Sequence, residues 1–151
     1  DQAMHLSTTA KIDHDWEYIH DRIGYNYRMP NLNAALGCSQ FEHLDSFIIK
    51  KRKLFMKYEK NFSNIEGVQI FKEPKNARSN YWLNTLFINK EIFDKEKILK
   101  LTNLKKIKTR PSWKLLNKLE PFKNCPSSDL KVSRELEETI INLPSSPFLV
   151  D

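Results

Sequence analysis

The amino-acid sequence predicts an α+β fold in which a long helix is followed by a small antiparallel sheet covered by helices. Two observations predict it. Apolar residues recur at helical spacing between Asn31 and Phe62. After Gly67, short runs rich in β-branched and aromatic residues alternate with short helical runs. A few strands mixed with helices in this way are typical of one small sheet with helices packed on it.

The N-terminal third predicts a loop and then helix. Asp1–Arg22 mixes turn-forming and aromatic residues without a sustained period, so we expect a loop there. Pro30 pushes the residue before it toward an extended conformation, so a helix should begin immediately after it. That helix is either one very long helix or two helices joined near Asp45. Asn64–Gly67 should end it, because Asn and Gly tolerate the left-handed cap.

The remaining sequence predicts three strands and three short helices. The strands are expected over Val68–Phe71, Tyr81–Ile88 and Ile107–Arg110, and the helices over Asp94–Leu104, Trp113–Leu119 and Ser133–Asn142. Tyr81 and Trp82 are expected to be core aromatics of the second strand. We expect residues 1–62 to finish a large domain and residues 63–151 to form a small α+β domain.

Composition narrows the class of protein. The chain has 151 residues, of which 40% are hydrophobic and 29% charged, as in a globular domain. It has no apolar run near the roughly 20 residues of a membrane span and no leader-like start, so we expect a cytoplasmic protein. Cys38 and Cys125 form no C-x-x-C pair, which predicts reduced thiols.

The net charge of +6 leaves a second hypothesis open. Clustered Lys and Arg can neutralise phosphates, so the chain could be a non-catalytic basic module that binds nucleic acid or a phosphorylated ligand. The lysines are spread along the chain, however, and the densest run, Lys50–Lys53, lies inside a helical pattern, which favours solvated faces. A third hypothesis is a structural domain that uses this fold without a cofactor.

Most catalytic patterns are missing from the sequence. The four histidines, His5, His14, His20 and His43, have no metal-ligand spacing with cysteines or carboxylates, and no metal is predicted. The sequence also has no phosphate-binding glycine motif and no nucleophile elbow.

The segment Gly24–Asn31 is the most informative one. It delivers an amide (Asn26), a guanidinium (Arg28) and two phenols (Tyr25 and Tyr27) just before a helix N-terminus. Those groups suit a phosphate or another anion, because the guanidinium and the amide donate hydrogen bonds and the helix end adds partial positive charge. The alternative is a packed Tyr/Arg turn with a cation–π contact.

The same segment carries a family resemblance. Gly24–Leu44 resembles the stretch that follows the cofactor-lysine region in the DegT/DnrJ/StrS family of sugar aminotransferases. Similar stretches elsewhere, in the family's order, are His14–Asp21, Lys51–Arg52, Ser79–Trp82, Thr109–Trp113 and Ile141–Pro147. His14–Asp21 looks like the branch that aminates UDP-linked 4-keto-6-deoxy amino sugars for legionaminic-acid or bacillosamine-type glycans.

The resemblance implies a fold and a reaction. Members are fold-type I transferases in which pyridoxal 5'-phosphate (PLP) is held by a lysine of the large domain. Glutamate gives the amino group and a keto-sugar nucleotide accepts it. The chain would then be the C-terminal part of such an enzyme, a homodimer in which the Gly24–Arg28 loop reaches the neighbouring subunit's cofactor phosphate.

The resemblance also implies residue roles. Asn26 and Arg28 are expected to bind the cofactor phosphate. Tyr25, Tyr27 and His20 are expected near the sugar nucleotide. Arg110 matches a small-domain position that faces the substrate's phosphates.

Two departures from the family pattern matter. The cofactor lysine belongs to a segment upstream of Asp1, so no lysine of this chain is expected to be catalytic and the chain alone is expected to be inactive. Members often have a histidine shortly after the Arg-Pro-x-Trp stretch, where Asn117 stands here.

Overall fold

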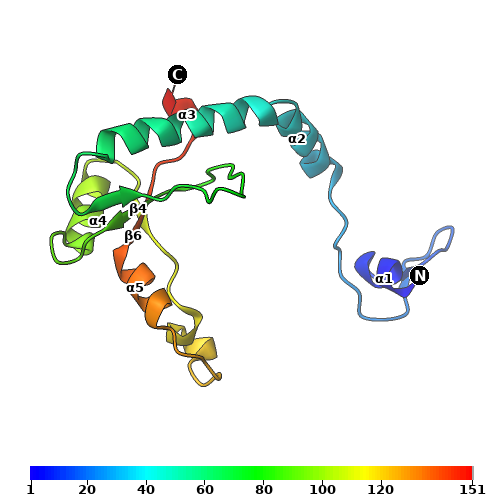
Figure 1. The fold of residues 1–151 in the computed structure, drawn as a ribbon. Coiled ribbons are helices and arrows are strands. Elements are labelled where there is room, and N and C mark those ends of the chain that lie inside the picture. Colours follow the sequence, from blue (N-terminus) through cyan, green and yellow to red (C-terminus); the bar gives the residue numbers. More distant parts are fainter. Residues whose placement is uncertain (151) are drawn as a thin grey trace. The chain divides into compact units, whose positions relative to one another are not determined.

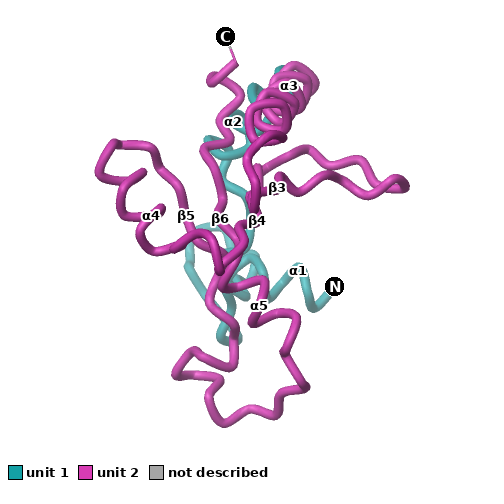
Figure 2. Tube along the Cα trace, turned by 60° about the vertical axis from the view of Figure 1, so that its left-hand side comes forward, with its two compact units in different colours: residues 1–44 teal, residues 45–151 magenta. Residues whose placement is uncertain are grey.

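A computed structural model describes residues 1–150. Contacts between residues divide the chain into two compact units, which are residues 1–44 and the rest of the chain (Figure 2). The first unit ends with one helix, and the second begins in the longer helix that follows it (Figure 1).

The first unit opens with a short helix, α1 (Gln2–Ser7), which is capped by Asp1. The Asp1 carboxylate accepts a hydrogen bond of 3.2 Å from the backbone N–H of Ala3. Two strands, β1 (Lys11–Ile12) and β2 (Ile19–His20), then pair antiparallel. The expectation of a loop over residues 1–22 is therefore wrong for these three elements, which are too short to create a period in the sequence.

Helix begins directly after Pro30, as predicted. It is divided into α2 (Asn31–Glu42) and α3 (Leu44–Phe62), which confirms the alternative of two helices joined near Asp45, with the joint at His43. No side chain of α2 is buried within the described chain. Its apolar residues are instead strongly exposed, among them Leu32 at 81% and Phe41 at 75%.

The second unit contains an antiparallel sheet of four strands. The strands are β3 (Val68–Ile70), β4 (Asn84–Ile88), β5 (Arg110–Pro111) and β6 (Ile140–Leu143), in the spatial order β3-β4-β6-β5. Leu86 of β4 stands opposite Ile70 on one side and Ile141 on the other. The sheet therefore joins residues such as Leu86 and Ile141, whose separation in sequence is more than half the length of the second unit.

Strand β6 corrects the prediction for the C-terminal helix. The helix expected over Ser133–Asn142 is α5 (Lys131–Thr139), and its expected last three residues lie in β6 instead. Consecutive β-branched residues here suit a strand. The strand β5 is also displaced, from Ile107–Arg110 to Arg110–Pro111. Proline is tolerated there because β5 is an edge strand.

The other short elements agree more closely with their predictions. Helix α4 (Lys95–Leu104) is capped by Asp94, whose carboxylate accepts from the backbone N–H of Lys97 at 3.0 Å. The helix expected over Trp113–Leu119 is reduced to a 3-10 turn, η1 (Leu116–Lys118). Two further 3-10 turns, η2 (Glu120–Phe122) and η3 (Pro147–Val150), complete the described chain.

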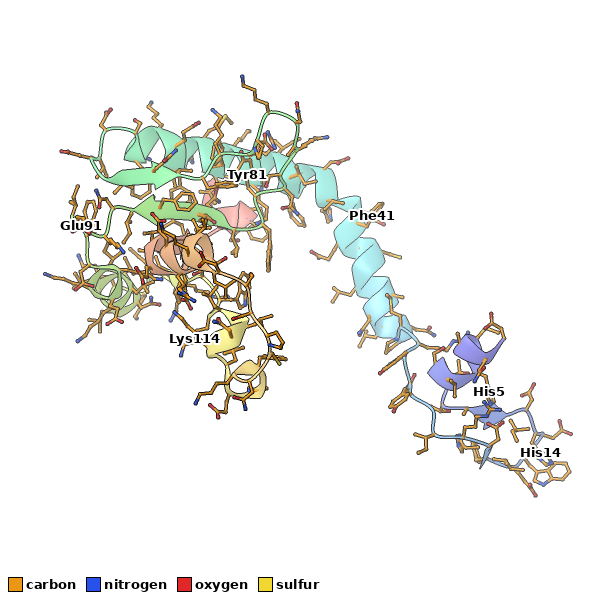
Figure 3. All side chains as sticks on the ribbon, turned by 60° about the horizontal axis from the view of Figure 1, so that its bottom comes forward. His5, His14, Phe41, Tyr81, Glu91 and Lys114 are labelled. Carbon is orange, nitrogen blue, oxygen red and sulfur yellow. The ribbon has the colours of Figure 1, made fainter. Side chains whose placement is uncertain are left out.

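The core lies between α3 and the sheet. Its buried residues are Phe55, Ile70, Tyr81, Leu86, Ile88, Ile141 and Leu143. Figure 3 labels Tyr81 beside α3, where its ring stacks on that of Phe55 with centroids 4.2 Å apart. Tyr81 is thus a core aromatic as predicted, but it lies before β4, which begins at Asn84 and not at Tyr81. Trp82 is 64% exposed, so the expectation that it is buried is wrong. The α+β fold itself is confirmed.

Within residues 1–150, no helix combines the length and the apolar character that a membrane crossing needs. The division after Leu44 leaves α3 with the sheet on which it packs. The assignment of residues 1–62 to the end of a large domain stays a prediction.

Candidate functional site

The loop that carries Asn26 and Arg28 is held by backbone hydrogen bonds to α1 and the turn after it. The N–H of Tyr25 donates to the carbonyl of Leu6 at 2.8 Å, and the N–H of Tyr27 donates to that of Ser7 at 3.0 Å. In return, the N–H of Thr9 donates to the carbonyl of Tyr25 at 3.1 Å. The loop is therefore fixed on both sides of Asn26, and Asn26 itself forms an isolated antiparallel β-bridge with Thr8.

Gly24 allows this close approach. A Cβ atom at Gly24 would lie 2.4 Å from the backbone nitrogen of Ala10 and from the carbonyl carbon of Thr9. Both neighbours adopt positive φ, at 69° for Thr9 and 52° for Ala10. Backbone on both sides cannot move away easily, so only glycine fits this position.

Asn26 and Arg28 line one open hollow of about 540 Å³ in the first unit. The other lining residues are Met4, Thr8, Thr9, Lys11 and Asp13. The lining thus combines one amide, two hydroxyls and two cations with a single carboxylate. The amide and the two cations can donate to a phosphate group, whereas the Thr8 and Thr9 hydroxyls already donate to backbone carbonyls of the first unit. The sequence did not identify Thr8, Thr9 or Lys11, because only the folding of α1 and β1 against the loop brings them here.

His20 reaches the same turn from β2. Its Nδ1 lies 2.8 Å from the carbonyl oxygen of Thr9, to which it donates. Next to it, Nε2 of His5 bonds Oδ1 of Asp21 at 2.6 Å, and this hydrogen bond lowers the pKa of the Asp21 carboxyl. Figure 3 labels His5 on α1. His20 is therefore a neighbour of the hollow rather than part of its lining.

The two loop tyrosines stack on each other and do not line the hollow. Their ring centroids are 5.4 Å apart with the planes at 15°. Tyr25 is 56% exposed and Tyr27 77%. The structure therefore does not bring the two phenols into the hollow with Asn26 and Arg28.

Arg110 belongs to the second unit and so lies in a separate hollow, of about 410 Å³. It shares this hollow with Lys51, Lys108 and Trp82. Asn117 lines yet another, largely apolar hollow, and its buried amide oxygen accepts no hydrogen bond within the described chain.

Lys51 and Arg52 have structural roles that their pattern did not predict. The ammonium of Lys51 donates to the carbonyls of Tyr81, Trp82 and Ser145 at 3.4, 3.2 and 2.5 Å. Burial lowers the pKa of Lys51. The expectation of a wholly solvated basic face is therefore wrong at this position.

Arg52 forms a two-pronged ion pair with Glu73. Nη1 lies 3.1 Å from one carboxylate oxygen, Nη2 pairs with the other, and Nη1 also donates to the carbonyl of Ser79 at 2.8 Å. The backbone N–H of Ser79 donates to Glu73 as well. These bonds, led by the one from Arg52, lower the pKa of Glu73 to about 2.

Comparisons with known proteins agree on one family. The profile of the DegT/DnrJ/EryC1/StrS aminotransferase family matches residues 2–151. A GDP-perosamine synthase of Escherichia coli O157:H7 is 33% identical over 149 residues, which are 99% of this chain and 40% of that protein. The chain thus spans about two fifths of the length of that relative.

Solved structures share the fold at low identity. The aminotransferase TlmJ from Streptoalloteichus hindustanus superposes with a TM-score of 0.84 at 16% identity, over 99% of this chain and 40% of that one. The PLP form of a putative sugar aminotransferase from Streptococcus pneumoniae has a TM-score of 0.78 at 19% identity, over 95% and 37% of the two chains.

Proposed function

Because the chain belongs to the DegT/DnrJ/EryC1/StrS aminotransferase family, whose members depend on PLP, we propose that it is the C-terminal part of a sugar aminotransferase. The whole protein moves an amino group from glutamate to a 4-keto-6-deoxy nucleotide sugar for surface polysaccharide or glycan synthesis. The observation that carries the proposal is the cationic hollow that Asn26 and Arg28 line together.

The donors of that hollow fit a cofactor phosphate. The guanidinium of Arg28 can make two parallel bonds to a phosphate, the amide of Asn26 can donate one, and the Thr8 and Thr9 hydroxyls lie beside them. Lys11 adds a second positive charge. When bound, PLP supplies the electron sink for amino transfer. The role of Asn26 and Arg28 is to hold and orient its phosphate.

We propose that these two side chains serve the site of a second subunit in a homodimer. Both residues are exposed, and the adjacent helix α2 presents Leu32, Leu36 and Phe41 at 63–81% exposure. Apolar side chains exposed to this extent on one helix favour burial against another surface. His20, Tyr25 and Tyr27 are placed near the sugar nucleotide in this arrangement, and the enzyme works in the cytoplasm.

The lysine that holds the cofactor lies, in this proposal, in a part of the protein outside this chain, so the chain alone does not transaminate. The nucleotide of the substrate is proposed to be a uridine diphosphate, from the resemblance of His14–Asp21. The relative from E. coli is named for a GDP-linked sugar, so both nucleotides belong in any substrate test.

The cofactor role predicts a selective effect of Arg28→Gln in the whole protein. The apparent Kd for PLP should rise at least about tenfold, because a charge-assisted pair to the phosphate is lost. The Kd for pyridoxal, which has no phosphate, should hardly change. Titration of the cofactor's absorption band measures both constants.

Arg22→Gln is the matched control, because Arg22 is an exposed arginine of the same unit that does not line the hollow. It should leave the Kd for PLP unchanged. Equal effects of the two substitutions, or an equal loss of PLP and pyridoxal affinity in Arg28→Gln, would show that Arg28 does not bind the phosphate.

A further inference from the structure

A hollow of about 530 Å³ in the second unit is lined by residues of α3, of the turn after α4 and of the C-terminal turn η3. Figure 1 shows η3 beside α3, and the rings of Phe47 and Phe148 meet there with centroids 6.0 Å apart. We propose that this hollow binds a phosphate monoester that carries an aliphatic chain. Such a ligand contacts the second unit alone, whatever the first unit binds.

Much of the lining is apolar. Leu54 is 4% exposed, and Tyr58 is held in place because its hydroxyl donates to the carbonyl of Pro144 at 2.9 Å. Ile107 and Leu149 also line the hollow, and they are 46% and 49% exposed. Aliphatic side chains that remain in contact with water gain free energy when an aliphatic chain covers them. One part of the ligand is therefore hydrocarbon.

Three lysines line the same hollow, which are Lys57 of α3 and Lys106 and Lys108 of the turn after α4. No carboxylate of residues 1–150 lines it, and none of the three lysines forms an ion pair with a carboxylate in that range. A ligand carboxylate would bring one negative charge to three ammonium groups, whereas a phosphate monoester brings about −1.5 to −2 at pH 7. The other part of the ligand is therefore a phosphate.

Lys106 stands at a helix end where glycine is the usual residue. Its φ is 62°, its N–H donates to the carbonyl of Asn103 at 3.0 Å, and the N–H of Ile107 donates to that of Thr102 at 2.8 Å. These two bonds close the end of α4 around a left-handed residue. Glycine adopts that conformation without steric strain and lysine does not, so folding alone favours glycine here. A lysine in this strained position that also lines a hollow indicates a role for its charge.

The turn that carries Lys106 and Lys108 is fixed before a ligand arrives. The Thr102 hydroxyl lies 2.5 Å from that of Thr109, and the side-chain amide of Asn103 donates to the Thr109 carbonyl at 3.0 Å. Thr109 itself is 5% exposed. Because both ends of the turn are tied together, little backbone order remains to be gained on binding, which favours affinity.

The test is calorimetric titration of the whole protein with hexyl phosphate, hexanol, hexanoate and inorganic phosphate. Hexyl phosphate should bind at least about tenfold more tightly than inorganic phosphate or hexanol, because each of these makes only part of the contacts. Hexanoate should bind more weakly than hexyl phosphate, because it carries less charge. Lys57→Gln should weaken hexyl phosphate binding about fivefold. Ile107→Ser should reduce the advantage of hexyl phosphate over inorganic phosphate.

Lys106→Gly separates a role in binding from a role in folding. It should not lower the melting temperature, because glycine relieves the strain of the left-handed φ, and it should still weaken hexyl phosphate binding about fivefold. Lys100→Gln, at an exposed position of α4 outside the lining, is the matched control for charge. Arg28→Gln controls for binding in the first unit. Neither control should change the affinity for hexyl phosphate, so the result is independent of the PLP titration.

Vesicles distinguish two sources of such a ligand. Co-sedimentation with vesicles of phosphatidic acid but not of phosphatidylcholine would identify a lipid headgroup as the ligand. Binding of hexyl phosphate without binding to either kind of vesicle would identify a free alkyl phosphate. The inference is overturned if hexyl phosphate binds no more tightly than inorganic phosphate, or if Lys57→Gln and Lys106→Gly leave its affinity unchanged.

Discussion

Two adjacent basic residues of α3 organise one turn of the second unit. Lys51 gathers three backbone carbonyls, and Arg52 pairs with Glu73 and the Ser79 carbonyl while its guanidinium lies 5.3 Å from the centre of the Tyr81 ring. In each case the cationic group is partly removed from water, and several hydrogen bonds compensate for the lost hydration. The turn that presents Trp82 therefore depends on side chains that lie 30 residues earlier in the sequence.

The Glu73 pair predicts a pH-dependent stability. The pKa of Glu73 falls from 4.5 to about 2 on folding, so its contribution is complete above about 4.5 and disappears as the pH falls toward 2. Glu73→Gln should lower the melting temperature at neutral pH by several degrees. It should also flatten the loss of stability between these two pH values. Thermal unfolding followed by circular dichroism across this range measures both effects.

Glu66→Gln, at an exposed position just after α3, is the control and should keep the wild-type pH dependence. If Glu73→Gln showed the same acid profile as the wild type, the ion pair would not stabilise the folded chain.

At the scale of single residues, the sequence could identify only functional groups that lie close together in the chain. Asn26 and Arg28 were found because their amide and guanidinium stand two residues apart in one loop, and the structure places both in one hollow. The partners of Lys51 and Arg52 could not be found, because Glu73 and Ser145 reach α3 only through the folded sheet.

Among the elements, β6 determines the architecture of the second unit. It pairs with β4 on one side and β5 on the other, so it places Arg110 of β5 next to the rest of the sheet. The helices α3 and α4 were predictable from sequence, because their apolar residues recur at helical spacing. The strand β6 was not, because its four residues directly continue the pattern of α5 and gain their hydrogen bonds from strands far away in the chain.

A substitution of Ile141 tests how much the stability of the fold depends on β6. Its side chain is 0% exposed, so Ile141→Ala should reduce the free energy of unfolding by about 2–5 kcal/mol through lost burial and a cavity. Val132→Ala, at a position of α5 that is 66% exposed, should change it by less than about 0.5 kcal/mol. Urea denaturation compares the two. Similar losses would mean that β6 is not part of the cooperative core.

Over the whole molecule, two hollows have more cationic than anionic side chains in their linings. The hollow of Arg28 has two cations against one carboxylate, and that of Arg110 has three cations and no carboxylate in its lining. Such a local excess of positive charge favours small anionic ligands, whereas most of the other Lys and Arg side chains are spread along the sequence. Sequence order and family resemblance were sufficient for the fold class, whereas the two hollows required the structure.

Arg28 is proposed to bind the phosphate of a cofactor that a second subunit holds. The most direct test mixes two forms of the whole protein, Arg28→Gln at a PLP concentration too low to load its weakened site and a variant without the cofactor lysine, and measures transamination of the mixed dimers. One site of each mixed dimer then has both an intact lysine and an intact Arg28 from opposite subunits, so activity should return to about half that of a wild-type dimer. Mixed dimers that stay as inactive as either parent would contradict the claim, because Arg28 would then serve its own subunit or no cofactor at all.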